Sequence, residues 1–258
     1  QNIGKITTET EGKITFENVS YTYEDTNIQA LDNISFTINK GETVAIMGKT
    51  GSGKSTILSL LTRIHDVTGN SKIKIDGHNL TEYDLYHLRN SMSIVPQDPF
   101  LFSDSIKNNI KFGKEDATDE EIITAAKMAV VDDNIQSFTN KYETILGERG
   151  ITLSGGQKQR VSIARAIIKE APILILDDCL SAVDTETEEK IVNNFKKIFN
   201  KKTTIIVTHR ASAAKNANKI IVLDSGRIVQ EDTHNQLVNQ EGFYKDLYTK
   251  QLSEKENA

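Results

Sequence analysis

The sequence has few of the features that mark secreted or membrane-spanning proteins. Its 258 residues contain one cysteine, Cys179, and three prolines. A single thiol cannot build an internal disulfide framework, so the sequence indicates a reducing compartment such as the cytoplasm. Apolar runs such as residues 173–176 are far shorter than the ~20 residues that a membrane span needs. The polar N-terminus shows no secretory signal.

An excess of positive charge is also absent. The 31 Lys and Arg residues are outnumbered by 36 Asp and Glu residues, which gives a net charge of −5. An acidic chain without a basic stripe is not expected to bind nucleic acid. With 37% hydrophobic and 26% charged residues, the composition is typical of a soluble globular protein with a substantial core.

Short apolar segments alternate with helical patterns along most of the chain. Residues 43–47 are short and almost continuously apolar, so they are predicted to be a buried strand. Residues 172–177 and 203–208 are predicted to be two further buried strands. Residues 56–63 and 157–169 have helical spacing. This alternation is typical of an α/β fold with a mainly parallel sheet and helices on both faces.

Three other segments depart from the parallel α/β pattern. Residues 13–38 alternate as strands around a turn, and residues 220–230 resemble a hairpin. Residues 98–157 are predicted to form a mostly helical insertion. Within them, Thr118 and Glu121 predict a capping box at the start of a helix over 118–138.

A phosphate-binding motif occupies residues 48–55. The sequence Gly-Lys-Thr-Gly-Ser-Gly-Lys-Ser fits G-x-x-x-x-G-K-[ST] between a predicted strand and a predicted helix. Glycines let backbone N–H groups converge on phosphate oxygens, and the helix adds its positive end. Lys54 is expected to reach the β and γ phosphates, and Ser55 to bind Mg²⁺. The residues predicted to cradle ATP are Gly48, Lys49, Thr50, Gly51, Ser52, Gly53, Lys54, Ser55 and Thr56.

Two acids follow another predicted strand. Asp177 and Asp178 stand where residues 172–177 end, and α/β sheets bind ligands at the carboxyl ends of their strands. Asp177 is the natural second partner of Mg²⁺, and Asp178 could polarise the attacking water. Two capping acids in a turn are the structural alternative. The motifs so far predict a P-loop NTPase without saying which kind.

A third motif resembles a family signature. Residues 153–157, Leu-Ser-Gly-Gly-Gln, are similar to the LSGGQ signature of the ATP-binding cassette (ABC) family. Here Ser154, Gly155, Gly156 and Gln157 would form a second anion site at a helix N-terminus. The resemblance implies that this site closes on ATP held by a second nucleotide-binding domain.

The resemblance extends from Lys13 to about Lys250. It implies a RecA-like P-loop NTPase core with an antiparallel β subdomain and an inserted helical subdomain at about 98–157. Tyr23 matches the aromatic residue that stacks on adenine. Gln97 matches the Q-loop that senses Mg²⁺ and water, and Asp184 matches the D-loop at the dimer seam.

His209 completes the implied site, because it matches the switch histidine that contacts the γ-phosphate. The resemblance therefore implies three catalytic residues, Asp178, His209 and Gln97. It implies that Ser55, Gln97 and Asp177 hold Mg²⁺.

Residues 147–150 resemble a loop typical of ABC exporters. An exporter would place a transmembrane domain on the same full-length chain, with residues 1–12 as the linker and 251–258 as a disordered tail. The fragment itself would be soluble and would work at the cytoplasmic face of a membrane. The sequence does not identify the cargo.

Asp178 departs from the family pattern, which usually has glutamate there. Its side chain is one methylene shorter, which removes about 1.5 Å of reach. The departure resembles the subunit with a degenerate catalytic acid in heterodimeric multidrug or lipid exporters. A homodimer with a working Asp178, a regulatory module that holds ATP, a non-transport ABC protein and an importer ATPase are the alternatives.

Overall fold

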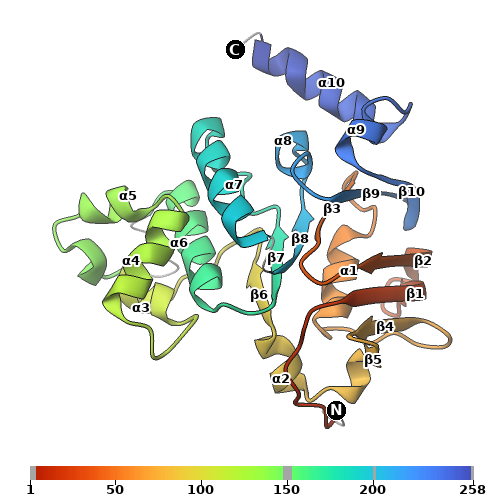
Figure 1. Cartoon of the computed structure of the whole chain (residues 1–258), viewed down its shortest axis with the longest axis horizontal. Coiled ribbons are helices and arrows are strands. Elements are labelled where there is room, and N and C mark those ends of the chain that lie inside the picture. The colour runs from red at the N-terminus through yellow and green to blue at the C-terminus, as the bar shows by residue number, and fades with distance from the viewer. Residues whose placement is uncertain (1–3, 148–152, 200–201, 257–258) are drawn as a thin grey trace.

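The computed structural model describes residues 4–147, 153–199 and 202–256 of the chain (Figure 1). A central sheet separates a mostly helical part, on the left of the figure, from an antiparallel sheet on the right. The elements in chain order are β1 (Ile14–Tyr23), β2 (Ile28–Ile38), β3 (Thr43–Gly48), α1 (Lys54–Leu61), β4 (Lys72–Ile75), β5 (His78–Asn79), η1 (Leu80–Glu82), α2 (Leu85–Asn90), β6 (Met92–Val95), α3 (Ile106–Lys111), α4 (Asp119–Met128), α5 (Asp132–Gln136), η2 (Lys141–Glu143), α6 (Gly155–Ile168), β7 (Ile173–Asp177), α7 (Thr185–Phe199), β8 (Thr203–Val207), α8 (Ala211–Ala214), β9 (Lys219–Asp224), β10 (Arg227–Asp232), α9 (His234–Leu237) and α10 (Phe243–Glu256).

The central sheet has the strand order β10-β9-β3-β8-β7-β6. Every pairing in it is parallel except that of β9 with β10, so the predicted α/β fold with a parallel core is confirmed. β3 is buried along its whole length because both of its faces are covered. Val44 and Ile46 pack with α1, while Ala45 and Met47 pack with the C-terminal helices.

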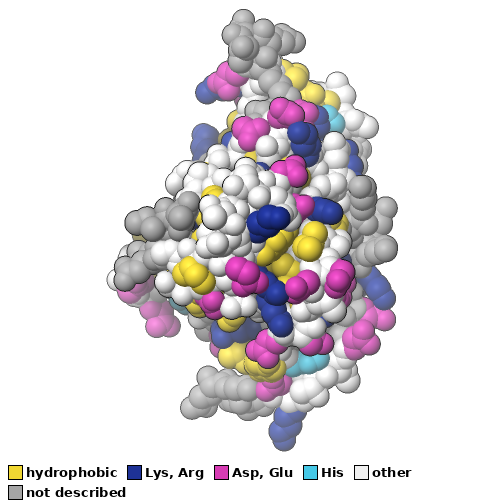
Figure 2. All heavy atoms as spheres, turned by 90° about the vertical axis from the view of Figure 1, so that its left-hand side faces the viewer, with side chains coloured by type: hydrophobic (Ala, Val, Ile, Leu, Met, Phe, Trp, Pro, Cys, Tyr) yellow, Lys and Arg dark blue, Asp and Glu magenta, His cyan; other side chains and the backbone are white. Residues whose placement is uncertain are grey.

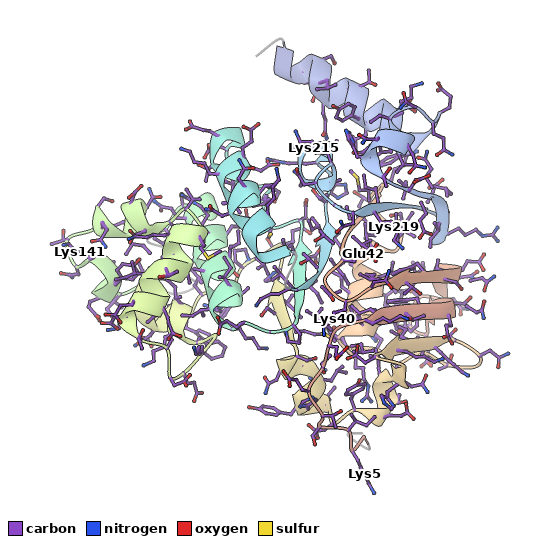
Figure 3. All side chains as sticks on the ribbon, in the orientation of Figure 1. Lys5, Lys40, Glu42, Lys141, Lys215 and Lys219 are labelled. Atoms are coloured by element: carbon purple, nitrogen blue, oxygen red, sulfur yellow. The ribbon has the colours of Figure 1, made fainter. Side chains whose placement is uncertain are left out.

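The antiparallel sheet has the order β2-β1-β4-β5 and confirms the predicted antiparallel subdomain. Phe16 of β1 stacks on Phe36 of β2 with ring centroids 4.5 Å apart. Lys219 of β9 joins the two sheets, because its Nζ donates to the Thr37 carbonyl of β2 at 2.7 Å and lies 4.0 Å from the Glu42 carboxylate (Figure 3).

The helical part contains the predicted capping box. The Thr118 hydroxyl accepts from the Glu121 N–H, and the Glu121 carboxylate accepts from the Thr118 N–H. The predicted helix over 118–138 is divided, however, into α4 and α5. Val130 between them has a left-handed φ of 57°. A β-branched residue rarely adopts this conformation, so the sequence gives no sign of the break.

The predicted end of the helical insertion at residue 157 falls inside α6. This helix continues to Ile168 and packs against α3, α4 and β6. Figure 2 shows the face formed by this side of the molecule, where acidic and basic side chains are interspersed with hydrophobic ones.

The N-terminal residues that were predicted to be a linker lie against the domain from Gly4 onward. The backbone N–H groups of Glu11, Gly12 and Lys13 donate to the Asp76 carboxylate. At the other end, α10 continues to Glu256, whereas the sequence predicts a disordered tail from residue 251. Within the described residues, no helix combines the length and apolar character needed to cross a membrane.

Candidate nucleotide-binding site

The phosphate loop follows β3 and is built on close backbone contacts. Gly48 has φ 145°, and a Cβ there would lie 2.2 Å from the carbonyl oxygen of Leu223 on β9. Gly53 has φ 106°, and its Cβ would lie 2.5 Å from the carbonyl oxygen of Ala30 on β2. Both positions therefore require glycine for conformation and for space.

Lys54 lies at the centre of this loop. Its Nζ donates to the carbonyl oxygens of Gly48 and Lys49, both at 2.8 Å, and its side chain is buried. Burial lowers the pKa of Lys54, and the negative charges of Asp178 and Asp177 oppose that shift. The loop thus holds a buried cation close to two carboxylates.

The acids at the end of β7 face the phosphate loop. Burial raises the pKa of Asp177, and the charge of Asp178 raises it further, while Lys54 and His209 lower it. Asp178 has a left-handed φ of 43° and donates its N–H to the Val207 carbonyl of β8 at 2.8 Å. Aspartate tolerates this conformation better than most residues. The structure therefore brings Lys54, Asp177, Asp178 and His209 into one electrostatic cluster.

These side chains meet because of the strand order. β3, β8 and β7 are parallel neighbours, so their carboxyl ends lie at one edge of the sheet. Lys54 follows β3, Asp177 ends β7 and His209 follows β8.

Tyr23 is held beside the start of α1. Its hydroxyl lies 3.1 Å from the Thr56 hydroxyl, and its ring makes edge contacts with Tyr21 and His65 at 5.0 and 5.5 Å. Tyr21, Tyr23 and His65 line the same open pocket. Tyr23 connects this pocket to Thr56 of α1, and the pocket has the aromatic lining that a base needs for stacking.

The site has features that suit Mg-ATP. The buried Ser52 hydroxyl has no hydrogen-bond partner in the described part of the chain, and nothing lies within 4 Å of a Cβ built on Gly51. The first turn of α1 has no side-chain cap and no acidic residue. Mg²⁺ bound to nucleotides takes few protein ligands. Ser55, which is exposed, and Asp177 could supply them.

The signature residues form a separate site. The Ser154 hydroxyl accepts from the Gln157 N–H at 3.3 Å, and the Gln157 side chain accepts from the Ser154 N–H at 2.9 Å. A Cβ built on Gly156 would lie 2.8 Å from the Ala182 carbonyl oxygen. The signature therefore packs on the loop after β7. Helix α6, which begins at the signature, packs against β6. In the central sheet, β7 and β8 lie between β6 and β3, the strand that leads into the phosphate loop.

Gln97 and Asp184 occupy loops at the same edge of the sheet. Gln97 follows β6, its side chain is exposed, and its carbonyl accepts from Gln159 Nε2 at 3.2 Å. Asp184 accepts from the Thr187 N–H at 2.9 Å and so caps α7, a bond that lowers the pKa of Asp184. Of residues 147–150, whose sequence resembles the exporter loop, residues 148–150 lie outside the described residues.

Gln159 is a connecting residue that the sequence reading missed. Its side chain is buried, donates to the Gln97 carbonyl and accepts from the Ala182 N–H at 3.2 Å. It therefore ties the loop after β6 to the loop after β7. The only sign of this role in the sequence was that Gln159 is a polar residue on the apolar side of a predicted helix.

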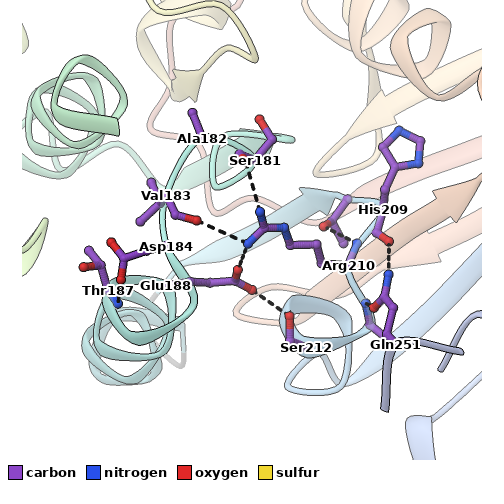
Figure 4. Close-up of polar contacts among 12 residues, drawn as sticks. Ser181, Ala182, Val183, Asp184, Thr187, Glu188, His209, Arg210, Ser212 and Gln251 are labelled. Carbon is purple, nitrogen blue, oxygen red and sulfur yellow. Dashed lines mark hydrogen bonds and ion pairs between the residues drawn. The ribbon is translucent and has the colours of Figure 1, made fainter. Parts of the chain in front are cut away.

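Arg210 is a second missed residue, and it joins the loop after β8 to the loop after β7 (Figure 4). Its guanidinium donates to the carbonyls of Ser181 at 3.0 Å and Val183 at 3.4 Å. It also pairs with the Glu188 carboxylate, which is buried and accepts from the Ser212 hydroxyl at 2.6 Å. Its position next to His209 was the only signal available.

A family model described as ABC transporter matches residues 31–181. The chain belongs to the ABC transporter family. The family assignment made from residues 48–55 and 153–157 is therefore confirmed, as is the P-loop NTPase fold.

Two curated ABC relatives are similar over almost the whole chain. A protein of Bacillus subtilis, named as the multidrug export ATP-binding/permease protein YgaD, is 47% identical over 238 residues, which cover 92% of this chain. A multidrug export ATP-binding/permease protein of Staphylococcus aureus is 46% identical over 239 residues, which cover 93%. The chain spans 41% of the length of each of these relatives.

A solved structure agrees with the fold. The chain superposes on a bacterial Atm1-family ABC exporter with ATP bound at a TM-score of 0.91 and 38% identity. The match covers 97% of this chain and 44% of the other. The exporter-type ABC nucleotide-binding fold is thus shown for this chain.

Proposed function

We propose that this chain is the ATP-hydrolysing motor domain of an exporter. It binds Mg-ATP on residues 48–56 with Tyr23 against the adenine. It dimerises around two Mg-ATP with a second nucleotide-binding domain, at the cytoplasmic face of a membrane. ATP binding and hydrolysis then shift a transmembrane domain between two conformations.

The observation that carries this proposal is the cluster of Lys54, Asp177, Asp178 and His209. A buried lysine in a glycine-rich loop, two carboxylates and an imidazole converge at one edge of the sheet. Phosphoryl transfer to water needs cations on the phosphates, a group that orients the water and little else. A purely structural cluster would not need the uncapped first turn of α1 beside it.

Each residue then has a role in hydrolysis. Lys54 binds the β and γ phosphates, Asp178 orients the water, and His209 contacts the γ-phosphate. Gln97 senses the metal and the water from the loop after β6. Ser55 and Asp177 would hold Mg²⁺, with Gln97 beside them, and bound Mg²⁺ supplies positive charge on the phosphate oxygens.

The signature and Asp184 serve the partner's nucleotide. Ser154 and Asp184 are exposed, and the contacts of the signature run to the loop after β7 rather than to the phosphate loop. Ser154, Gly155, Gly156 and Gln157 therefore need a phosphate from another chain. The dipole of α6 and the Ser154 hydroxyl suit such a phosphate.

A transmembrane domain on the same polypeptide is the expected second partner. The curated relatives are ATP-binding/permease proteins of which this chain spans 41%. The exposed aromatic rings of Phe100, Phe102 and Phe112 contact one another, and the Arg165 guanidinium lies 5.4 Å from the Phe102 ring centroid. Such a patch, close to Gln97 in sequence, suits a protein contact.

Asp178 makes this chain's own site slow. A positioned general base contributes ~10²–10⁴ in rate, and a side chain about 1.5 Å short forfeits part of that. Basicity is not the cause, because Asp and Glu differ by only ~0.4 pKa units. In a heterodimer, the fast site would combine a partner's phosphate loop with the signature of this chain.

ATPase assays of the full-length polypeptide, purified as a dimer of two copies of this chain, test this proposal. We expect slow hydrolysis that Lys54→Ala abolishes and Asp178→Glu raises about tenfold. Wild-type protein with no hydrolysis above the Lys54→Ala background would contradict the motor function. The slow-site idea fails if Asp178→Glu leaves the rate unchanged while His209→Ala abolishes it.

A regulatory module that binds ATP without hydrolysis is the second candidate, and Asp178 is the observation that favours it. It predicts tight ATP binding without turnover in both the wild type and Asp178→Glu. The shared placement of Lys54 and His209 with the two acids favours the motor instead.

A further inference from the structure

The C-terminal helix α10 is firmly attached to the domain at its first turn. Tyr244 is fully buried in a core with Met47 of β3 and Val222 of β9. Its hydroxyl lies 2.7 Å from His234 Nδ1, and its N–H donates to the Gln230 side chain. The start of α10 is thus fixed relative to the central sheet.

Gln251 lies on the same side of α10, two helical turns beyond Tyr244. Its Nε2 donates to the His209 carbonyl at 2.9 Å, and its Oε1 accepts from the Ala211 N–H at 2.8 Å (Figure 4). One side chain therefore spans the end of the loop that carries His209 and the start of α8.

These two bonds satisfy backbone groups that have no other hydrogen-bond partner among the described residues. Ala211 is buried, so leaving its N–H unpaired would be costly. The imidazole of His209 points away from Gln251, toward the opposite side of the loop (Figure 4). Gln251 consequently holds the backbone of His209 without touching its ring.

The loop after β8 is also held by contacts on the side away from Gln251. Arg210, the next residue, is fastened to the loop after β7 through the Ser181 carbonyl and Glu188. The peptide units around His209 are thus clamped between α10 and the loop that contains Asp184. A reacting group held by such a clamp has a defined position before the nucleotide arrives.

We propose that Gln251 is a positioning residue for ATP hydrolysis, through which α10 sets the backbone of His209 and hence the direction of its imidazole. The proposal rests on the proposed role of His209 at the γ-phosphate. It extends the site to a helix that lies outside the residues matched by the family model. Release of α10 would then slow hydrolysis without weakening ATP binding.

The test compares Gln251→Met and Gln251→Glu in the full-length polypeptide. Methionine keeps the shape and loses both bonds. Glutamate keeps the acceptor for the Ala211 N–H and loses the donor to the His209 carbonyl. Because small misplacements of a reacting group can cost ~10²-fold, we expect kcat to fall about tenfold in both variants, with KM for ATP within about twofold of wild type.

Gln240→Met is the matched control, because Gln240 is exposed and precedes α10. It should leave kcat and KM unchanged. Wild-type kcat in Gln251→Met, or a loss confined to KM, would overturn the proposal. Full kcat in Gln251→Glu would also overturn it, since that result assigns Gln251 a merely structural bond to Ala211. His209→Ala with wild-type turnover would instead refute the proposed function of His209.

Discussion

Helices α1 and α6 both begin at glycine-rich motifs, and their first turns differ in how the backbone N–H groups are satisfied. α1 follows Gly53 in a left-handed conformation and has no side-chain cap. α6 begins after Ser154 with a complete capping box from Gln157. The free N–H groups of α1 need an external anion, whereas α6 is closed by its own side chains.

This difference agrees with the proposal that the phosphate loop binds this chain's own ATP and the signature binds the partner's ATP. The phosphate loop has its lysine, its acids and its aromatic residue in one chain. The signature has a preformed helix start, and its serine still has an O–H to donate while its oxygen accepts from the Gln157 N–H. The residues that this chain contributes to the first site are therefore assembled before a partner arrives, and the helix start at the second site is stable without a ligand.

Lys54→Ala, which tests the phosphate loop, should have the largest effect on ATP hydrolysis. It removes the cation that we propose binds the phosphates, and losing one preorganised donor to a transition state costs ~10²–10³ in kcat. ATPase assays and a nucleotide-binding titration of the full-length polypeptide measure the loss. Lys40→Ala is the control, because Lys40 is exposed and, among the residues that the structure describes, forms an ion pair only with Glu11 across 3.5 Å. Hydrolysis at the wild-type rate in Lys54→Ala would refute the assignment of the phosphate loop.

Ser154→Ala should have an intermediate effect and should separate the two sites. Removing the cap costs ~1 kcal/mol of stability, and turnover should also fall because the partner's phosphate loses a donor. ATP binding to the monomeric chain should not change. Thr118→Ala removes the matching capping box of α4 and should cause the same loss of stability without the loss of turnover. Equal turnover in the two variants would mean that Ser154 is only a cap.

Gly155→Ala and Gly156→Ala should give the smallest effects. A Cβ on Gly155 would meet Ala182 Cβ at 3.7 Å, an ordinary contact, whereas one on Gly156 would meet the Ala182 carbonyl oxygen at 2.8 Å. Gly155→Ala should be neutral or up to ~1 kcal/mol more stable, from helix propensity. Gly156→Ala should be ~1 kcal/mol less stable because of overpacking. Urea midpoints of the 258-residue chain measure both, and the reverse order would contradict the packing.

Much of the fold follows from local pattern. The apolar run of β3 and the capping box of α4 predict their elements correctly, because burial and capping are readable in short windows. The division between α4 and α5 at Val130 was missed, since a left-handed valine contradicts local preference and is imposed by packing. The disordered tail predicted from residue 251 was wrong as far as Glu256, because the anchors of α10, Tyr244 and Gln251, find their partners in distant segments.

The sequence by itself determined the family, and it predicted the chemistry of the site. Residues 48–55, 153–157 and 177–178 form the contiguous motifs that indicate both, and each motif stands at a strand end, at a helix start or at both. Only the tertiary structure decided how the loops are held. Gln159, Arg210 and Gln251 are single polar residues in unremarkable positions. Their roles depend on the strand order, which brings the ends of β6, β7 and β8 together, and on the packing of α10.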